Sequence, residues 1–246
     1  MHVLARESSE HNEITVYETG ELYGETGRFR CMRFADDAVQ GAIDLRRPER
    51  VVLAYQRAVI GLLEALRPAL RSLFVIGHGV GTIPMRFANR NVVVAEIDRA
   101  VVELSRTYFD YKTDNVRIGD GGEWLAREDD GAYDAIVADA FTRDGTPRSL
   151  TTPTFFRTAA SKLAPGGVLL FNLFGKPRND KRIGSVYAAL ADAFPHAAAF
   201  AMAGDDEEGN LVLVGGLREF GAREIEIAGC RRVSIERGYV ARDSRG

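Results

Sequence analysis

The sequence has little cysteine, no long apolar run and no excess of charge of one sign. Its two cysteines, Cys31 and Cys230, cannot build a disulfide framework or a zinc-ligand cluster. The net charge is −3 and both signs are mixed along the chain, which argues against the basic stripe of a nucleic-acid-binding protein. The longest apolar stretches, such as residues 168–174, are far too short to span a membrane. We therefore expect no nucleic-acid partner, no membrane association and no metal.

We also expect no signal peptide in the N-terminal region. Its first twenty residues include Arg6, Glu10 and Glu18, and they contain no apolar segment of the kind found in signal peptides. Scarce cysteine favours the reducing cytoplasm as well. Apolar residues make up 46 % of the 246 residues, which is enough for a full core. We expect a cytoplasmic protein with one good-sized domain, alone or with a small appendage.

The patterns on either side of Pro48 differ. Residues 1–47 predict a small β-rich domain, and residues 48–246 predict a doubly wound, Rossmann-like α/β domain in which strands alternate with helices. A helix is expected to begin at Pro48, because proline is tolerated at a helix start. The last two strand-like runs are separated only by GDDEEG, which predicts an antiparallel edge. The expected strands are 13–20, 28–34, 72–77, 92–97, 115–119, 133–139, 167–174, 197–202 and 210–216, and the expected helices are 48–66, 98–109, 121–127, 152–163 and 185–194.

The segment VIGHGVG ends the first strand of the α/β part with glycines at every second position. Ligands of doubly wound sheets bind outside the carboxyl ends of the strands, where Gly77, Gly79 and Gly81 leave the backbone without Cβ atoms. The spacing departs from the G-x-G-x-x-G fingerprint, which disfavours a nicotinamide oxidoreductase. A tight strand-to-helix turn explains the glycines equally well. His78 has no evident partner in the sequence, and its side chain could point to solvent.

Carboxylates follow the next two predicted strands. Glu96 ends the second strand, where an acid can accept from both hydroxyls of a ribose. Asp120 follows the third strand, where a carboxylate can accept from the exocyclic amino group of a purine. Either could instead be a solvated or turn-forming acid. Three such features at three successive strand ends predict a site for an adenine nucleoside without a phosphate clamp, as S-adenosylmethionine (AdoMet) and its relatives require.

Asp139 ends the fourth predicted strand and faces the same cleft. A carboxylate in this place can bind an ammonium group, accept its proton and orient the lone pair. Its alternative role is to cap a following turn. Residues 142–155 are rich in glycine, proline, threonine and serine, and they predict a mobile loop over the site.

Taken in order, these segments resemble the spermidine synthase family, within the class of AdoMet-type methyltransferase folds. VIGHGVG resembles the family's GGGDG loop, VAEID its ribose-binding strand end, GDGGEWL its adenine-binding segment and YDAIVADAF the strand with the catalytic aspartate. SKLAPGGVLLF, DDAVQG and LAYQRAV resemble three further family segments. The resemblance covers roughly residues 13–215. It implies an N-terminal β-domain, a Rossmann-like domain and an active site between them.

The resemblance also assigns roles to residues. It implies that Asp139 and Tyr55 are catalytic. With the strand-end pattern above, the predicted nucleoside-binding residues are Gln40, Gln56, Gly77, Gly79, Gly81, Glu96, Asp120 and Gly121. The donor substrate is expected to be AdoMet or decarboxylated AdoMet, and the acceptor a small-molecule amine. We further expect a homodimer.

Three departures from the family concern the donor tail and the acceptor. The aspartate of GGGDG, which in the family holds the amine of the aminopropyl chain, is Val80 here. The second aspartate of the family's DSSD falls at Thr142, with Asp144 two residues on, and the glutamate of SYQEM is Arg57. A diamine acceptor calls for several acids, so the nucleoside half of the site is the better supported half.

The departures leave three functions open: aminopropyl transfer, methyl transfer to a non-polyamine small molecule, and non-catalytic nucleoside binding. An apolar residue at position 80 leaves the bare ammonium of decarboxylated AdoMet without a carboxylate, which is costly in a dehydrated pocket. AdoMet carries its own carboxylate. We therefore expect AdoMet to bind at least as tightly as the decarboxylated donor.

Overall fold

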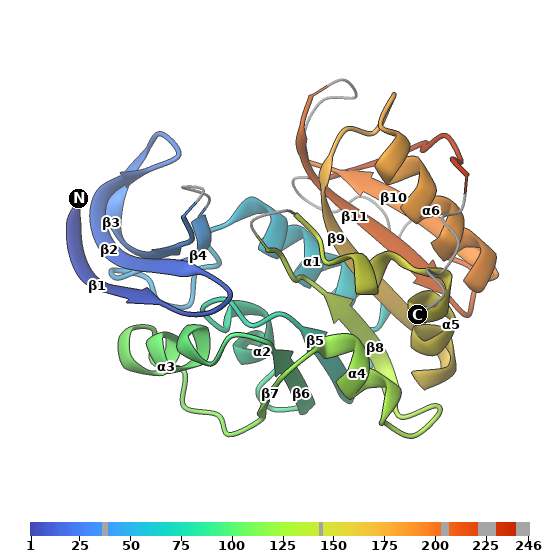
Figure 1. Cartoon of the computed structure of the whole chain (residues 1–246), viewed down its shortest axis with the longest axis horizontal. Helices are drawn as coiled ribbons and strands as arrows, with labels where there is room; N and C mark the ends of the chain where they lie inside the picture. Colours follow the sequence, from blue (N-terminus) through green and yellow to red (C-terminus); the bar gives the residue numbers. More distant parts are fainter. Residues whose placement is uncertain (36–38, 143–144, 203–206, 221–229, 240–246) are drawn as a thin grey trace.

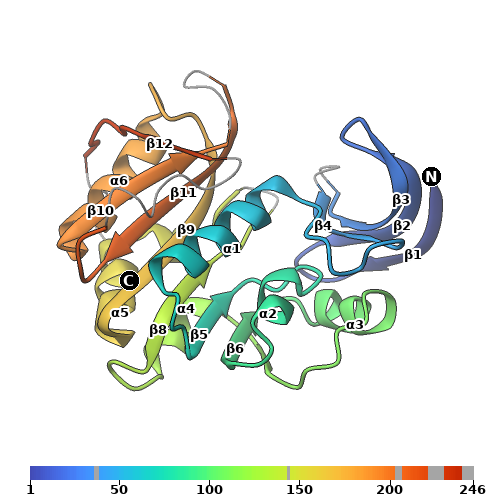
Figure 2. The same cartoon turned by 180° about the vertical axis from the view of Figure 1, so that it is seen from behind.

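The computed structural model describes residues 1–35, 39–142, 145–202, 207–220 and 230–239 (Figure 1). In this part of the chain, a four-stranded antiparallel sheet stands beside a larger sheet that carries helices on both faces (Figures 1 and 2). The α/β architecture and the β-rich N-terminal part therefore confirm the predicted fold class. The described helices include none that is long and apolar enough to cross a membrane.

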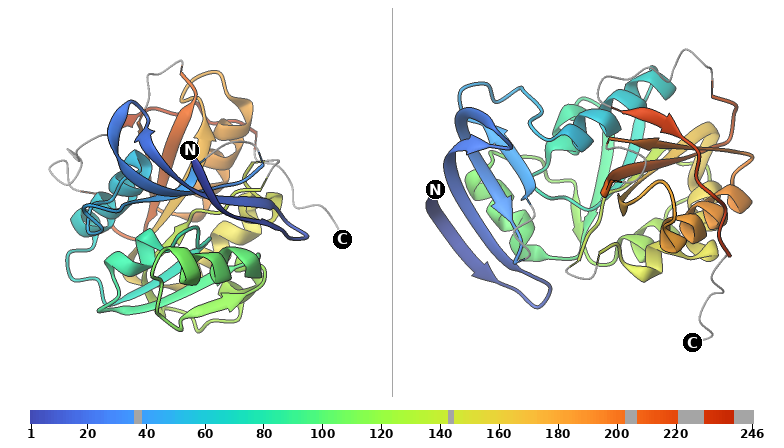
Figure 3. Two further views of the ribbon diagram at one scale, coloured as in Figure 1. Left: turned by 90° about the vertical axis from the view of Figure 1, so that its left-hand side faces the viewer. Right: turned by 90° about the horizontal axis from the view of Figure 1, so that it is seen from above.

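The N-terminal sheet is a simple meander. Its strands are β1 (His2–Ser8), β2 (Glu13–Leu22), β3 (Glu25–Arg33) and β4 (Val39–Asp44). Tyr23 and Gly24 both have positive φ in the turn between β2 and β3, as a tight hairpin requires. One face of the sheet, with Ile14 and Met32, packs on helix α3 (Arg99–Tyr108), and Figure 3 shows the sheet as a separate layer on that side.

The larger sheet has the strand order β12-β10-β11-β9-β8-β5-β6-β7. Its strands are β5 (Ser72–Ile76), β6 (Asn91–Glu96), β7 (Val116–Ile118), β8 (Tyr133–Ala138), β9 (Leu163–Gly175), β10 (His196–Ala201), β11 (Gly209–Gly216) and β12 (Arg231–Val233). Strands β5 to β9 are parallel, whereas β11 pairs antiparallel with both β9 and β10. The predicted antiparallel edge is thus confirmed.

Helices cover both faces because side chains alternate along the strands. Phe74 and Ile76 of β5 belong to the core under the helices drawn in front in Figure 1, whereas Leu73 and Val75 belong to the core on the opposite face. The helices are α1 (Ala54–Leu66), α2 (Thr82–Arg86), α3, α4 (Gly121–Ala126), α5 (Pro153–Lys162) and α6 (Lys181–Ala193), with a 3₁₀ turn at Arg148–Thr151. Asp98 caps α3 by accepting from the Ala100 N–H at 3.0 Å, as its position at a helix start predicts.

The prediction that the first helix begins at Pro48 is wrong. Helix α1 begins at Ala54, and the residue before it, Leu53, is extended. The reason lies in the N-terminal sheet: Val51 forms a β-bridge with Ile43, and Leu53 is buried in the sheet's second core. These contacts keep residues 48–53 non-helical. The division into domains 1–47 and 48–246 stays a prediction. The boundary lies in the segment between the end of β4 at Asp44 and the start of α1 at Ala54.

Candidate active site

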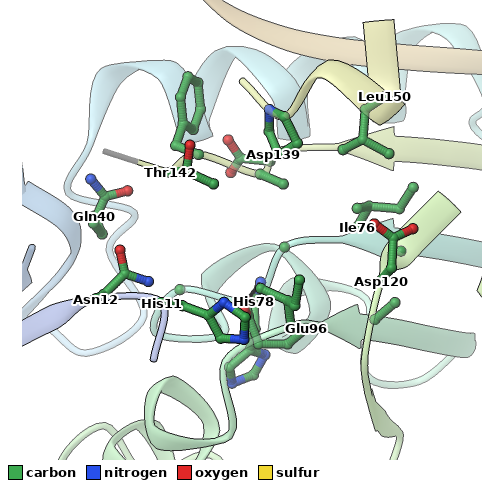
Figure 4. Close-up of a pocket in the computed structure, with 18 of the residues that line it drawn as sticks. His11, Asn12, Gln40, Ile76, His78, Glu96, Asp120, Asp139, Thr142 and Leu150 are labelled. Carbon is green, nitrogen blue, oxygen red and sulfur yellow. Dashed lines mark hydrogen bonds between the residues drawn. The ribbon is translucent and has the colours of Figure 1, made fainter. Parts of the chain in front are cut away.

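A cavity of about 730 Å³ opens at the carboxyl ends of the parallel strands, between the two sheets. The chain runs outward from β5 to β6 and β7, then returns to β8 on the other side of β5. The loops after β5 and β8 therefore diverge, and such a switch point is where doubly wound sheets bind ligands. Figure 4 shows Asn12 and Gln40 on the side of the N-terminal sheet, with Ile76 and Asp120 opposite.

All but one of the predicted site residues line this cavity. Those that do are Gln40, Tyr55, Gln56, Gly77, Gly79, Glu96, Asp120, Gly121 and Asp139. The exception is Gly81, which precedes α2 with φ of 84°. A Cβ atom at Gly81 would approach the Tyr111 ring to 2.3 Å, so helix entry and packing account for this glycine without a ligand.

Gly77 sits where the loops after β5 and β8 touch. Its φ is +93°, and a Cβ atom there would lie 2.1 Å from the carbonyl oxygen of Asp139. Only glycine permits both this backbone conformation and this approach. The same absence of a side chain leaves the floor of the cavity as bare backbone.

Glu96 is a buried carboxylate in the cavity wall, with 9 % of its surface exposed. Its Oε2 accepts from the His78 N–H at 2.8 Å, and its Oε1 accepts from the Asp98 N–H at 2.9 Å. Burial raises the pKa of the carboxyl, and the backbone N–H groups of Asp98, His78 and Ile97 oppose this rise. Each oxygen keeps capacity to accept one more hydrogen bond, which suits a pair of neighbouring hydroxyls.

Asp120 caps α4 and lines the cavity. Its Oδ1 accepts from the Glu123 N–H at 2.9 Å, so the cap occupies one of its two oxygens. The helix cap and the predicted adenine contact are therefore compatible roles for the same carboxylate. Gln56 offers a further acceptor, since its Oε1 is buried and has no hydrogen-bond partner within the described residues.

Asp139 lies where β8 meets the cavity, partly buried between α1 and β9. The Asn172 amide donates to its Oδ1 at 2.8 Å, and the Tyr55 hydroxyl lies beside it. Burial raises the pKa of the Asp139 carboxyl to about 6, against the opposing effect of these two neighbours. Burial and the Asp139 charge also raise the pKa of Tyr55, so its hydroxyl stays protonated. The pair offers a carboxylate base and a neutral hydroxyl.

A model of the spermine/spermidine synthase domain matches residues 52–202, which include most of these side chains. The chain belongs to the spermine/spermidine synthase family.

Relatives of known sequence agree with that membership, and a solved structure shares the fold. A spermine synthase of Arabidopsis thaliana is 28 % identical over 178 residues, which cover 68 % of this chain and 46 % of that protein. A probable polyamine aminopropyl transferase of Bifidobacterium longum is 32 % identical over 133 residues, covering 52 % and 29 %. The chain thus spans about half the length, or less, of these relatives. The structure of a probable spermidine synthase from Corynebacterium glutamicum superposes with a TM-score of 0.83 at 20 % identity, covering 100 % of this chain and 98 % of that one.

Val80 does not line the cavity, so the expectation that position 80 meets the donor tail there is wrong. Its side chain is 1 % exposed and contacts Gly41 of β4, within the apolar cluster of Ile14 and Met32. Val80 is absent from the cavity lining. The expectation that AdoMet binds at least as tightly as the decarboxylated donor therefore has no support from the position of Val80.

The other two departures from the family pattern differ in their consequences. Arg57 is exposed and points away from the cavity, where its guanidinium donates to the carbonyl groups of Val51 and Val52. Thr142 does line the cavity, and Asp144 lies outside the described residues. Thr142 is accordingly the one departure of the three that the structure places in the site.

Replacing Val80 with aspartate is expected to destabilise the protein. The new carboxylate would be buried among Ile14, Met32 and Val101, and an unpaired buried charge costs about 3–5 kcal/mol of unfolding free energy. Val80→Thr keeps the shape without the charge and is expected to cost less. Chemical denaturation of the three proteins measures the difference. A stable Val80→Asp protein would mean that position 80 reaches the cavity after all.

The β1–β2 turn contributes residues that sequence reasoning missed. Glu10, His11 and Asn12 line the cavity, and Asp98 holds their turn in place. The Ser9 hydroxyl donates to Asp98 Oδ2 at 2.6 Å, and the Asn12 amide donates to the same oxygen at 3.2 Å. Contacts across more than eighty residues leave no local pattern in a sequence.

His78 is buried, at 5 % exposure, rather than directed to solvent. Its Nε2 lies 2.7 Å from the Ser105 hydroxyl, which itself donates to the Val102 carbonyl. Burial lowers the pKa of His78 to about 4, so the ring is neutral at pH 7. Among the described residues, no group of three or more histidine, cysteine or acidic side chains could hold a metal ion.

Proposed function

We propose that this protein transfers an aminopropyl group from decarboxylated AdoMet to a small amine. The observation that carries the proposal is the convergence of Glu96, Asp120 and Asp139 on one cavity at the switch point of the sheet. The first two are suited to the ribose and the adenine, and the third to an amine. A spermidine synthase that shares this fold, with a TM-score of 0.69 at 15 % identity, has been crystallised with the transition-state analogue AdoDATO, which supports the same donor here.

The reaction needs alignment and an unprotonated amine. The amine nitrogen attacks the carbon bonded to the sulfonium, the C–N bond forms, and the C–S bond breaks with its electron pair going to sulfur. The leaving thioether is neutral, so no acid is required. Holding the two reactants in line is worth about 7–11 kcal/mol of the barrier, and the glycine floor and Glu96 would hold the donor in that position.

Asp139 would prepare the acceptor. An alkylammonium resembles lysine, with a pKa of about 10.4, so its neutralisation at pH 7 costs roughly 4–5 kcal/mol. A carboxylate beside the nitrogen binds the ammonium first and then accepts its proton. A carboxyl with a pKa of about 6 is still ionised at pH 7 and is a better proton acceptor than an ordinary aspartate. The neutral Tyr55 hydroxyl would orient the carboxylate and the amine.

The purified protein incubated with putrescine and either donor tests the proposal. We expect decarboxylated AdoMet to yield methylthioadenosine and an aminopropylated amine, both detected by mass spectrometry. Formation of S-adenosylhomocysteine and a methylated amine from AdoMet would favour methyl transfer instead. Nucleoside binding without any product from a panel of amines would favour a non-catalytic homologue. A cytoplasmic location and a homodimer stay predictions.

A further inference from the structure

Asn172 is a polar residue in the middle of an otherwise apolar strand. It lies in the run VLLFNLF of β9, and its side chain is 1 % exposed. A buried amide destabilises a protein unless its donors and its acceptor are hydrogen-bonded. Neither the nucleoside pattern nor the family resemblance accounts for this residue, so its partners must explain it.

The sheet register brings Asn172 between two polar side chains. Ala138 of β8 pairs with Phe171, so Asp139 and Asn172 follow side by side at the end of that parallel pair. On the other side, Val212 of β11 pairs with Asn172, which puts Asn210 on the same face of the sheet two residues away. The Asn172 amide nitrogen donates to Asp139 Oδ1 at 2.8 Å, and the Asn210 amide nitrogen donates to Asn172 Oδ1 at 3.2 Å.

These two hydrogen bonds determine which end of the Asn172 amide meets the carboxylate. An asparagine amide has a donor end and an acceptor end of nearly the same shape. If the acceptor end faced Asp139, two oxygens would repel each other. Because an ionised carboxylate can only accept, Asp139 fixes the nitrogen of Asn172 toward itself, and the oxygen of Asn172 accepts from Asn210. The donation by Asn210 keeps the Asn172 amide in this orientation.

We propose that Asn172 and Asn210 form a positioning relay that keeps the Asp139 carboxylate ionised and aimed at the acceptor amine. The relay rests on the proposed function, in which Asp139 is the base. Neither asparagine touches the substrates in this scheme. Asn172 acts through Asp139, and Asn210 acts through Asn172.

The groups around Asp139 explain why the relay would change the pKa of its carboxyl. The titratable group that faces Asp139 from α1 is Tyr55, which stays neutral, and the other titratable groups that line the same cavity are Glu10, His11, Glu96 and Asp120. Within the described part of the chain, the groups that lower the pKa of Asp139 are Asn172 and Tyr55, and burial opposes its ionisation. Hydrogen bonds to the ionised form are thus what favours that form. Without Asn172, the Asp139 carboxyl would be protonated at higher pH than in the wild type.

The test compares Asn172→Leu, Asn210→Leu and the double variant with the wild type. The ¹³C carboxyl resonance of Asp139, assigned with Asp139→Asn, is followed against pH, and so is the acid limb of kcat/KM. We expect Asn172→Leu to shift both upward by about one pH unit or more, as the loss of a hydrogen bond to a charged group predicts. Asn210→Leu should give a smaller shift in the same direction. In the Asn172→Leu background, Asn210→Leu should add nothing, because its effect passes through the missing amide.

Leu170→Ala is the matched control, since Leu170 is a buried residue two positions earlier on the same face of β9. It should lower the melting temperature without moving the titration of Asp139. The relay is overturned if Asn172→Leu lowers activity equally at every pH while the resonance titrates as in the wild type. It is overturned as well if the two single shifts add in the double variant. Asn210 is only half-buried, so Asn210→Leu carries the test if Asn172→Leu does not fold.

The NMR titration separates the two proposals, because it requires no turnover. A wild-type protein without transferase activity would refute the proposed function, and the resonance would still report on the relay. Conversely, an active enzyme whose Asp139 titration ignores both asparagines would refute the relay alone.

Discussion

Asp139→Asn is expected to lower turnover by about a hundredfold or more, in line with losses of a general base. The asparagine keeps the shape of the side chain, and its oxygen can still accept from the Asn172 amide that lies 2.8 Å from Oδ1. It cannot accept a proton or bind an ammonium as a counter-ion. Affinity for methylthioadenosine should change little, because the proposed nucleoside contacts are at Glu96 and Asp120. Steady-state kinetics and calorimetry on the same preparation give both values.

The pH dependence adds a second signature to this variant. The acid limb of kcat/KM in the wild type should report a group with a pKa near 6 and should be absent from any residual activity of the variant. Stability gives an independent check of folding. Because the pKa of Asp139 is raised in the folded state, its contribution to wild-type stability is fully present below the unfolded pKa of about 3.9 and is lost as the pH rises through about 6.

Asp139→Asn lacks this titration, so its stability should rise relative to the wild type across that window. A well-folded variant with near-full activity would show that Asp139 is only structural. A variant that loses methylthioadenosine affinity as much as turnover would place Asp139 in the nucleoside half of the site instead.

Glu96→Gln is expected to weaken methylthioadenosine binding by at least tenfold. Charge-assisted hydrogen bonds contribute about 1.5–3 kcal/mol each, and the glutamine replaces one accepting oxygen with a donor. That donor would also face the N–H of His78 or of Asp98, both of which donate to Glu96 in the wild type. The structure around the first turn of α3 should therefore lose some stability as well.

Isothermal titration calorimetry measures the affinity, and Glu103→Gln serves as the control because Glu103 is exposed on α3. The control should bind methylthioadenosine like the wild type. Unchanged affinity in Glu96→Gln would remove the ribose assignment and, with it, the strongest reason to place a nucleoside in this cavity.

Many residues of this site can be predicted from the sequence, because the ends of the apolar strand segments can be recognised there. Buried runs such as residues 73–76 and 135–138 are continuous in apolar residues, so the residue that ends each run is known. Parallel strands put those ends at one edge. Gly77, Glu96, Asp120 and Asp139 therefore come together in the structure as their positions predict.

Side-chain direction within a turn is not visible in the same way. Val80 lies between two residues of positive φ, Gly79 and Gly81, and this backbone turns its side chain toward the N-terminal sheet. The position of a residue in a motif gives no sign of that rotation. Likewise, the helix is expected to begin at Pro48, but the contacts of Val51 and Leu53 with the N-terminal sheet keep this segment non-helical. Long-range polar contacts, such as the hydrogen bond between Ser9 and Asp98, also cannot be predicted from a local sequence pattern.

The contact between Gly77 and the Asp139 carbonyl has a consequence for how substrate preference can change. Gly77, which forms the floor of the cavity, and Asp139, the proposed base, belong to one closely packed backbone unit, in which a methyl group added at Gly77 has no room. The opposite wall comes from the β1–β2 turn and from Gln40 of β4, and its side chains are replaceable without disturbing that unit. One wall of the cavity thus tolerates no substitution at Gly77, whereas the side chains of the opposite wall can be changed. New acceptors are expected to be reached by substitutions at His11 and its neighbours in the turn, and a redesign of this protein should begin there.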